Sequence, residues 1–201
     1  PLAKEMLEII NKKEKPPLLI SSPTEGLAEV FYGLGEALAG EGGVSLGTIY
    51  LQLALDAKPD HVFALAALAN AQEAVKRYDD ALKTYDRIPA GTPLQSAIDI
   101  RRAFDLNSLD RTDEAKAILV KLSEQDPKDV RPLEALGNIM RARKDYQSAV
   151  TYFTKALAVL NKSDSRNWGY YYARGTAYER LKNWSAAEAD LKRALALAPD
   201  Q

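Results

Sequence analysis

The sequence contains no cysteine, a single histidine and only two methionines. The lack of cysteine excludes disulfides, thiol nucleophiles and zinc–thiolate sites. One histidine, His61, cannot form a histidine-rich metal site, and a histidine-based catalytic triad would have to use that residue. No stretch reaches the ~18–20 continuous apolar residues of a transmembrane helix. We therefore expect no enzyme activity, no cofactor or metal, and no direct membrane insertion.

The chain also lacks a net charge of either sign. Its 27 Lys and Arg residues almost cancel its 28 Asp and Glu residues, which leaves a net charge of −1 over 201 residues. A nearly neutral chain has no overall basic field for nucleic acid, so no nucleic-acid partner is expected. The apolar fraction of 46% is ample for a core and excludes bulk disorder.

What the chain does contain is an internal repeat of 34 residues. Pro59, Pro93 and Pro127 are 34 residues apart, and series of alanines, small residues and large apolar residues keep the same spacing. The alanine, small-residue and apolar series each contain one interval of 38 residues, which indicates an insertion of four residues. The polar segment 161–167 is its expected place. The register predicts an N-terminal helix and extended connector over 1–27 and a repeat array over 28–201, with units 28–61, 62–95, 96–129, 130–163 and 168–201.

Each unit has the pattern of two helices joined by a polar turn. In 62–95, apolar residues at helical spacing predict a first helix over 62–77, and a second helix follows that ends before Pro89. Small residues such as Ala69 and Gly137 would let two antiparallel helices approach to ~8–10 Å. Because no segment alternates as strands do, the fold is expected to be all-α.

This pattern resembles the tetratricopeptide repeat family, whose 34-residue unit is a helix–turn–helix with a terminal proline. The resemblance covers 28–201 and rests on fragments such as LEALG at 133–137, YFTKA at 152–156 and WSAA at 184–187. It implies a right-handed superhelical solenoid of antiparallel helix pairs, five units with a partial repeat at the N-terminus. The first unit departs most, with Gly47 where the others have alanine.

The two ends of the chain also carry expectations. Residues 2–13 have the pattern of an amphipathic helix, and 16–23 that of an extended connector whose Leu18, Leu19 and Ile20 lie against the array. The order of motifs resembles large bacterial repeat proteins. Since the sequence begins without Met and stops at a repeat boundary, we expect a fragment of a longer array from the bacterial cytoplasm or periplasm.

Several residues that could suggest chemistry have a structural interpretation. His61 lies in a turn between units, where a solvated histidine is expected. The acidic pairs at 79–80 and 113–114 begin second helices, where acidic side chains complement the helix dipole. In the run 170–172, Tyr171 has core spacing, which leaves Tyr170 and Tyr172 for a ligand.

The resemblance also implies a binding surface, because the first helices of such pairs line the concave face of the solenoid. Their outward side combines aromatic residues with Asn and Arg, which suits a peptide segment or partner helix. In the last unit, Thr176 and Arg180 share this side with Tyr172. We expect a non-catalytic protein-interaction scaffold whose partner-binding groove includes Tyr32, Phe63, Asn70, Arg101, Phe104, Arg131, Asn138, Arg141 and Tyr172.

Charge is distributed unevenly along the array. Residues 28–61 carry a net charge of −4, and 130–167 carry +4. Arg101, Arg131 and Arg141 could form a basic strip for a partner with acidic groups. Some family members hold a peptide carboxylate in a Lys/Asn/Arg clamp. Asn70, Arg101 and Arg131 resemble part of it, but Ala66 replaces the lysine, so a dedicated clamp is not expected. The alternative is a self-assembling structural module that oligomerises through its terminal repeats.

Overall fold

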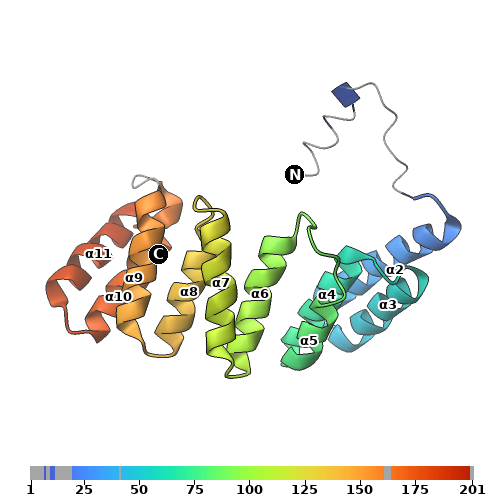
Figure 1. Cartoon of the computed structure of the whole chain (residues 1–201), viewed down its shortest axis with the longest axis horizontal. Coiled ribbons are helices and arrows are strands. Elements are labelled where there is room, and N and C mark those ends of the chain that lie inside the picture. The colour runs from blue at the N-terminus through green and yellow to red at the C-terminus, as the bar shows by residue number, and fades with distance from the viewer. Residues whose placement is uncertain (1–6, 8–9, 12–19, 41, 161–163, 200–201) are drawn as a thin grey trace. The chain divides into compact units, whose positions relative to one another are not determined.

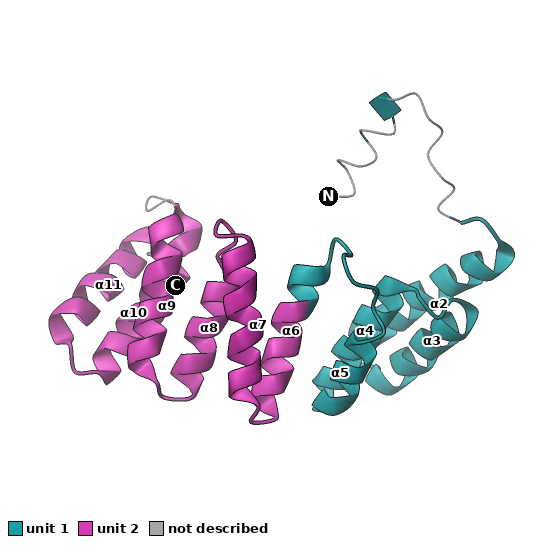
Figure 2. Cartoon of the chain, in the orientation of Figure 1, with its two compact units in different colours: residues 1–98 teal, residues 99–201 magenta. Residues whose placement is uncertain are grey.

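The computed structural model describes residues 7, 10–11, 20–40, 42–160 and 164–199 (Figure 1). Over these residues the chain is helical, without a β-strand. It divides into two compact units, Pro1–Ile98 and Asp99–Gln201, and the boundary falls inside helix α6 (Figure 2). None of the described helices is both long enough and apolar enough to span a bilayer.

The first unit contains two helix pairs and the beginning of α6 (Gln95–Ser108). The first pair is α2 (Pro23–Gly40) and α3 (Val44–Ala57), and the second is α4 (Val62–Ala74) and α5 (Tyr78–Tyr85). Helix α3 packs on both α2 and α4, and α4 packs on α5, so the core forms from local contacts. Its largest buried side chains are Leu51, Leu65 and Tyr85.

The second unit contains the rest of α6 and the pairs that follow it. Helix α7 (Thr112–Gln125) packs on α8 (Arg131–Ala142), and α9 (Tyr146–Val159) packs on both α8 and α10 (Trp168–Arg180). A short 3-10 turn, Ser165–Asn167, precedes α10, which pairs with α11 (Trp184–Leu197). The largest fully buried side chains of this unit are Phe153, Leu119, Leu136 and Ile139.

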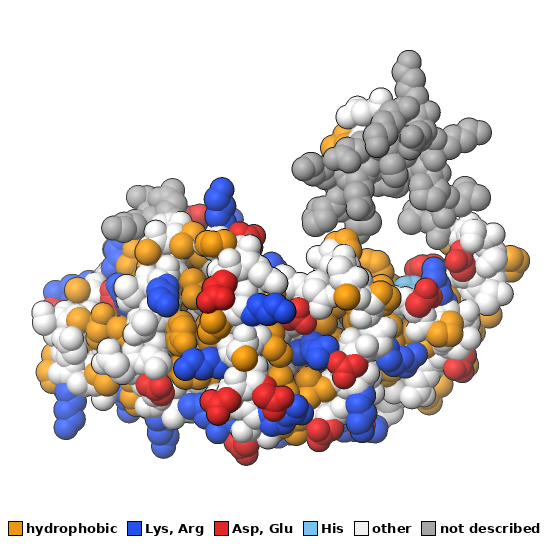
Figure 3. All heavy atoms as spheres, in the orientation of Figure 1, with side chains coloured by type: hydrophobic (Ala, Val, Ile, Leu, Met, Phe, Trp, Pro, Cys, Tyr) orange, Lys and Arg blue, Asp and Glu red, His pale blue; other side chains and the backbone are white. Residues whose placement is uncertain are grey.

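The same type of turn joins the two helices of every pair that the structure describes. Its central residue has a positive φ, between 60° and 87°. The next backbone N–H donates to the carbonyl five residues earlier, as from Arg77 to Gln72 at 2.8 Å, which satisfies the helix end. Figure 3 shows basic side chains projecting at the edge where the α8–α9 and α10–α11 turns lie. The central residues are Gly42, Lys76, Asp110, Lys144 and Lys182.

This turn corrects the predicted length of the first helix in 62–95. The helix ends at Ala74 rather than at residue 77. Lys76 adopts the left-handed conformation, with φ of 60°, and a helix cannot continue through such a residue. A lysine gives no sign of this conformation in the sequence, whereas the equivalent Gly42 does.

Glycine lets paired helices approach closely, as Gly137 and Gly47 show. A Cβ atom on Gly137 would lie 2.7 Å from the Phe153 ring. A Cβ atom on Gly47 would lie 2.7 Å from the backbone nitrogen of Ala39 and 2.7 Å from the carbonyl oxygen of Gly35. The backbones of α2 and α3 are therefore too close for the alanine that the other units carry at the position of Gly47.

The N-terminal expectations can be compared with the structure only at a few positions. Most of the helix predicted over 2–13 lies outside the described residues, as do Leu18 and Leu19. Ile20, the described member of that apolar trio, is 48% exposed. Its burial against the array is therefore only partial.

Candidate functional site

An aromatic cluster in the first unit brings together two of the predicted partner-binding residues. The ring centroid of Tyr32, on α2, lies 6.2 Å from that of Phe63, on α4. The imidazole of His61 lies 5.2 Å from the Tyr32 ring. Phe63 is 47% exposed, so the cluster has an aromatic surface open to solvent.

The prediction that His61 is a solvated turn residue is wrong. Its side chain is buried, with 4% of the residue exposed. The Nδ1 atom accepts a hydrogen bond from the backbone N–H of Ala64 at 3.1 Å and caps α4. Since Nδ1 accepts, Nε2 carries the proton and donates to Glu29 at 3.0 Å. Both ring nitrogens are thus used to join α4 to α2, and the role of His61 is structural.

Acidic side chains surround the aromatic cluster. Burial, the hydrogen-bonded Glu36 carboxylate and the charge of Glu29 together raise the pKa of Tyr32 to about 12. The phenol therefore stays neutral at physiological pH and acts as a donor. Asn70 lies on α4, where its Oδ1 accepts from the Tyr85 hydroxyl at 3.1 Å. Asn70 and Glu36 share a mostly apolar pocket of about 230 Å³.

Of the three arginines in the predicted basic strip, Arg131 is bound by a neighbouring carboxylate. Its guanidinium donates to both oxygens of Asp129, at 2.8 Å and 2.6 Å. This hydrogen bonding raises the pKa of Arg131. Arg101, on α6, is exposed, and Phe104, one turn further on, is 40% exposed. An outside carboxylate would therefore have to compete with Asp129 for Arg131.

The third arginine, Arg141, lines a polar pocket of about 370 Å³ in the second unit. Its Nη2 atom donates to Oδ1 of Asn138 at 3.3 Å, so two predicted residues meet here. The pocket adds Tyr146, at the start of α9, which the sequence had not indicated. The full lining is Asn138, Arg141, Ala142, Tyr146, Thr176 and Arg180.

Of the tyrosine run at 170–172, only Tyr172 is exposed. Tyr171 is buried, as its spacing predicted. The Tyr170 hydroxyl donates to Glu134 at 2.7 Å, and burial raises its pKa. Tyr172 is 49% exposed and lies 6.2 Å from Trp168 between ring centroids. It lines an apolar pocket of about 490 Å³ with Trp168, Leu191, Ala194, Leu195 and Ala198.

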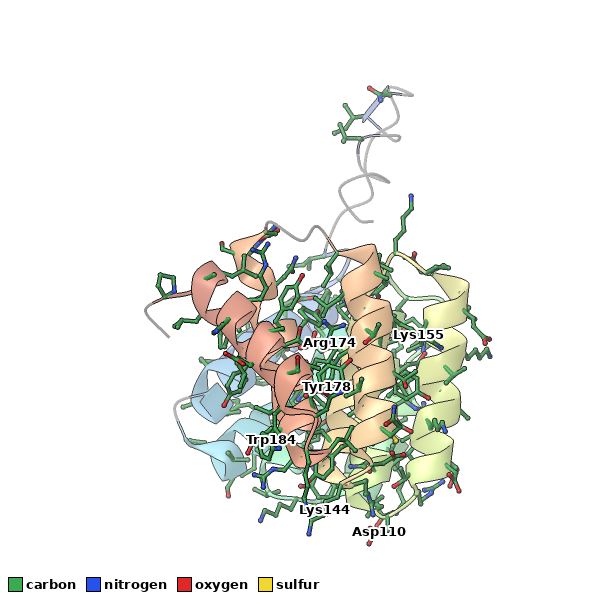
Figure 4. The ribbon with its side chains drawn as sticks, turned by 90° about the vertical axis from the view of Figure 1, so that its left-hand side faces the viewer. Asp110, Lys144, Lys155, Arg174, Tyr178 and Trp184 are labelled. Atoms are coloured by element: carbon green, nitrogen blue, oxygen red, sulfur yellow. The ribbon has the colours of Figure 1, made fainter. Side chains whose placement is uncertain are left out.

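A partly buried ion pair joins the two helices of the last pair. Arg174 of α10 donates to both carboxylate oxygens of Asp190 of α11, at 2.7 Å and 2.8 Å, and to Thr154 at 3.0 Å. The guanidinium also lies 5.9 Å from the ring centre of Tyr178, and Figure 4 shows the two side chains on α10. Both charged groups are occupied, so the pair is a packing element. Among the residues that the structure places, no cluster of three or more His, Cys, Asp or Glu side chains could hold a metal ion.

Comparison with known proteins identifies the helix pairs. A tetratricopeptide repeat model matches residues 128–200 and another matches 64–94, which together span about half of the chain. The heat shock protein sti1 homolog of Schizosaccharomyces pombe is 35% identical over 68 residues. That match covers 34% of this chain and 11% of the relative, so this chain corresponds to a small part of that protein.

Solved structures show the same fold. MamA of Desulfovibrio magneticus RS-1, from residue 41 to its end, matches with a TM-score of 0.69 at 15% identity, over 90% of this chain and 99% of that one. YrrB, described as a TPR protein with an unusual peptide-binding site, matches with a TM-score of 0.58 at 16% identity, over 98% and 93%. At these identities the likeness concerns the fold alone. From the sequence matches and the repeated helix pairs, we conclude that this chain belongs to the tetratricopeptide repeat family.

Proposed function

We propose that this chain is a non-catalytic scaffold that binds a peptide segment or a helix of a partner protein. Tetratricopeptide repeats generally serve as protein-interaction modules, and stacked helical repeats offer extended surfaces for that purpose. Each compact unit has its own proposed site, the outward side of its first helices, which we call the first-helix face of that unit. The helices are α2 and α4 in the first unit, and α8 and α10 with most of α6 in the second.

The observation that carries the proposal is the exposure of large aromatic side chains on the first-helix face of each unit. Phe63, Phe104 and Tyr172 are 47%, 40% and 49% exposed and come from α4, α6 and α10. Aromatic residues are the usual anchors of protein interfaces, because they bury a large apolar area with few rotatable bonds. Asn70, on α4, and Asn138, on α8, carry amides that can hydrogen-bond a peptide backbone.

The test is selection of a random linear-peptide display library on this chain, followed by titration of the selected peptides. We expect Phe63→Ala to weaken peptides that bind the first unit, and Phe104→Ala or Tyr172→Ala those that bind the second, by about tenfold or more, as for an interface anchor. Val159→Ala is the matched control, since Val159 is 47% exposed on α9, a second helix. Equal affinity of the three variants and the control would contradict the first-helix face as the site.

A second candidate function, self-association with another copy of this chain, is favoured by the apolar pocket of the last helix pair. Leu195 is 57% exposed on α11, next to the exposed ring of Tyr172. Light scattering over a concentration series should show a rise in mass that Leu195→Glu abolishes, because a buried charge would face the apolar pocket of the other copy. A constant monomer mass at all concentrations would exclude this candidate.

A further inference from the structure

We propose that the pocket of Arg141 and Arg180 binds the carboxylate of a Glu or Asp side chain in the partner peptide. The inference rests on the proposed peptide-binding function and adds the chemistry of one contact. The two guanidinium groups come from the last turns of α8 and α10, and both line the pocket of about 370 Å³. The site lies within the second unit and includes parts of three helices.

The first line of support is that these two arginines lack an acidic partner. Five other arginines of the second unit are held by carboxylates at 2.6–2.8 Å. Within the described ranges of the chain, by contrast, neither Arg141 nor Arg180 forms an ion pair, and Arg141 donates only to the neutral amide of Asn138. That hydrogen bond orients the guanidinium without neutralising it. The acid-paired arginines are Arg111, Arg131, Arg143, Arg166 and Arg174.

The second line of support is that the fold does not require these two arginines. A cation in the last turn of a helix complements the helix dipole, which would account for either arginine singly. The first unit, however, contains a pocket at the same repeat positions, where Ala39 and Ala74 stand in place of Arg141 and Arg180. Helices α2 and α4 carry no basic residue in their last turns. Because the helix pair forms there without cations, the two arginines are a property of this pocket.

The third line of support is the chemistry of the lining. A guanidinium presents parallel N–H donors that match the planar carboxylate, and two guanidinium groups can bind both carboxylate oxygens. The pocket also contains the amide of Asn138, the hydroxyl of Thr176, the Tyr146 side chain and the methyl group of Ala142. The polar groups can bind peptide amides, and the ring and methyl group can contact the methylene stem of a Glu side chain. We therefore assign the occupant to an acidic side chain of a peptide.

The experiment uses the peptides selected on the intact chain and needs no knowledge of the natural partner. We expect the selected sequences to share a Glu or Asp at a fixed position. Changing that residue to Gln or Asn in the peptide should weaken binding by roughly 10- to 100-fold, since it leaves two guanidinium groups without a charged partner. This comparison leaves the protein unchanged, so folding of a variant cannot confuse it.

The protein side of the test is the double variant Arg141→Gln and Arg180→Gln. It should lose the same affinity and should bind the acidic and the amide peptide equally. Arg166→Gln is the control, because Arg166 is an exposed arginine of the same unit already paired with Asp164, and it should keep full affinity. Nε–H resonances of Arg141 and Arg180 should shift with the acidic peptide and not with its amide analogue.

The outcomes separate this inference from the proposed function. Selected peptides without an acidic residue, or binding that is insensitive to the double variant, would overturn the carboxylate site and leave the scaffold intact. A phosphoserine peptide that binds more tightly than the Glu peptide would replace the carboxylate with a phosphate as the occupant. Failure of the library to yield any binding peptide would contradict both proposals.

Discussion

Replacing Gly47 by alanine tests whether the backbones of α2 and α3 are in direct contact. The added methyl carbon would lie 2.7 Å from the Ala39 nitrogen and the Gly35 carbonyl oxygen, and 2.8 Å from the Ala39 Cβ. Two of these atoms belong to the backbone, so rotation of a side chain cannot relieve the overlap. The helices must separate by a few tenths of an ångström, and overpacking of this kind costs ~1–3 kcal/mol.

Gly33→Ala provides the matched control. Gly33 lies within α2, and a Cβ atom there would have no neighbour within 4 Å. Both substitutions gain ~1 kcal/mol of helix propensity, so the difference between them isolates the effect of the close contact. We expect Gly33→Ala to raise the urea midpoint above that of the unchanged protein. The midpoint of Gly47→Ala should lie below that of Gly33→Ala by the equivalent of ~1–3 kcal/mol.

The assay is urea unfolding followed by circular dichroism, with the slope of the transition compared among the three proteins. Repeat proteins can depart from two-state unfolding, so the variants should be compared by midpoint only if their slopes agree. Coinciding midpoints for Gly47→Ala and Gly33→Ala would show that the two helices do not touch at Gly47. The argument for glycine at that position would then fail.

Three further predictions concern charge and turn geometry. Asp190→Ala should lower the free energy of unfolding by ~1–3 kcal/mol in chemical denaturation, because it leaves the partly buried guanidinium of Arg174 without its counter-ion; a loss below ~0.5 kcal/mol would contradict the importance of the pair. Lys144→Gly should raise the melting temperature, since it relieves a φ of 64° and gains ~0.5–1 kcal/mol; an unchanged or lower value would speak against strain in the turn. Hydrogen bonds from the Ser21 hydroxyl and backbone N–H lower the pKa of Glu25 to about 2, from 4.5. These bonds should therefore stabilise the fold fully above pH 4.5 and lose their effect as the pH falls through about 2, and an NMR titration of Glu25 with its midpoint near 4.5 would refute this.

The sequence predicted the helices well and the local geometry of their ends poorly. Apolar spacing and the repeated small residues report on helix packing, which is regular along the chain, and the all-α fold follows from them. The left-handed conformation of Lys76 depends on hydrogen bonds at the helix end and leaves no trace in residue type. His61 is buried because Glu29 of a different helix receives its Nε2–H, a contact that turn position alone cannot reveal.

Some features of the predicted site could likewise be read from the sequence, and others could not. Repeat register was enough to place Phe63 and Tyr172 on first helices with exposed rings. It could not show that Arg131 is bound by Asp129, or that Tyr146 of a second helix lines the pocket of Arg141. Those facts depend on rotamers and on where each helix ends. The boundaries of the repeat units and the partner-binding role of the site remain predictions.

The packing of helices on their neighbours along the chain has a kinetic consequence. Contacts between sequence-adjacent helices, such as α2 with α3 and α8 with α9, close short loops at little entropic cost, which favours rapid folding. A helix pair can then form early and serve as a template for the next, within each compact unit. Local unfolding should also involve single helices or helix pairs. Amide hydrogen exchange should therefore be slow in interior helices and faster in α11, because α11 has a helix partner on one side only among the described helices.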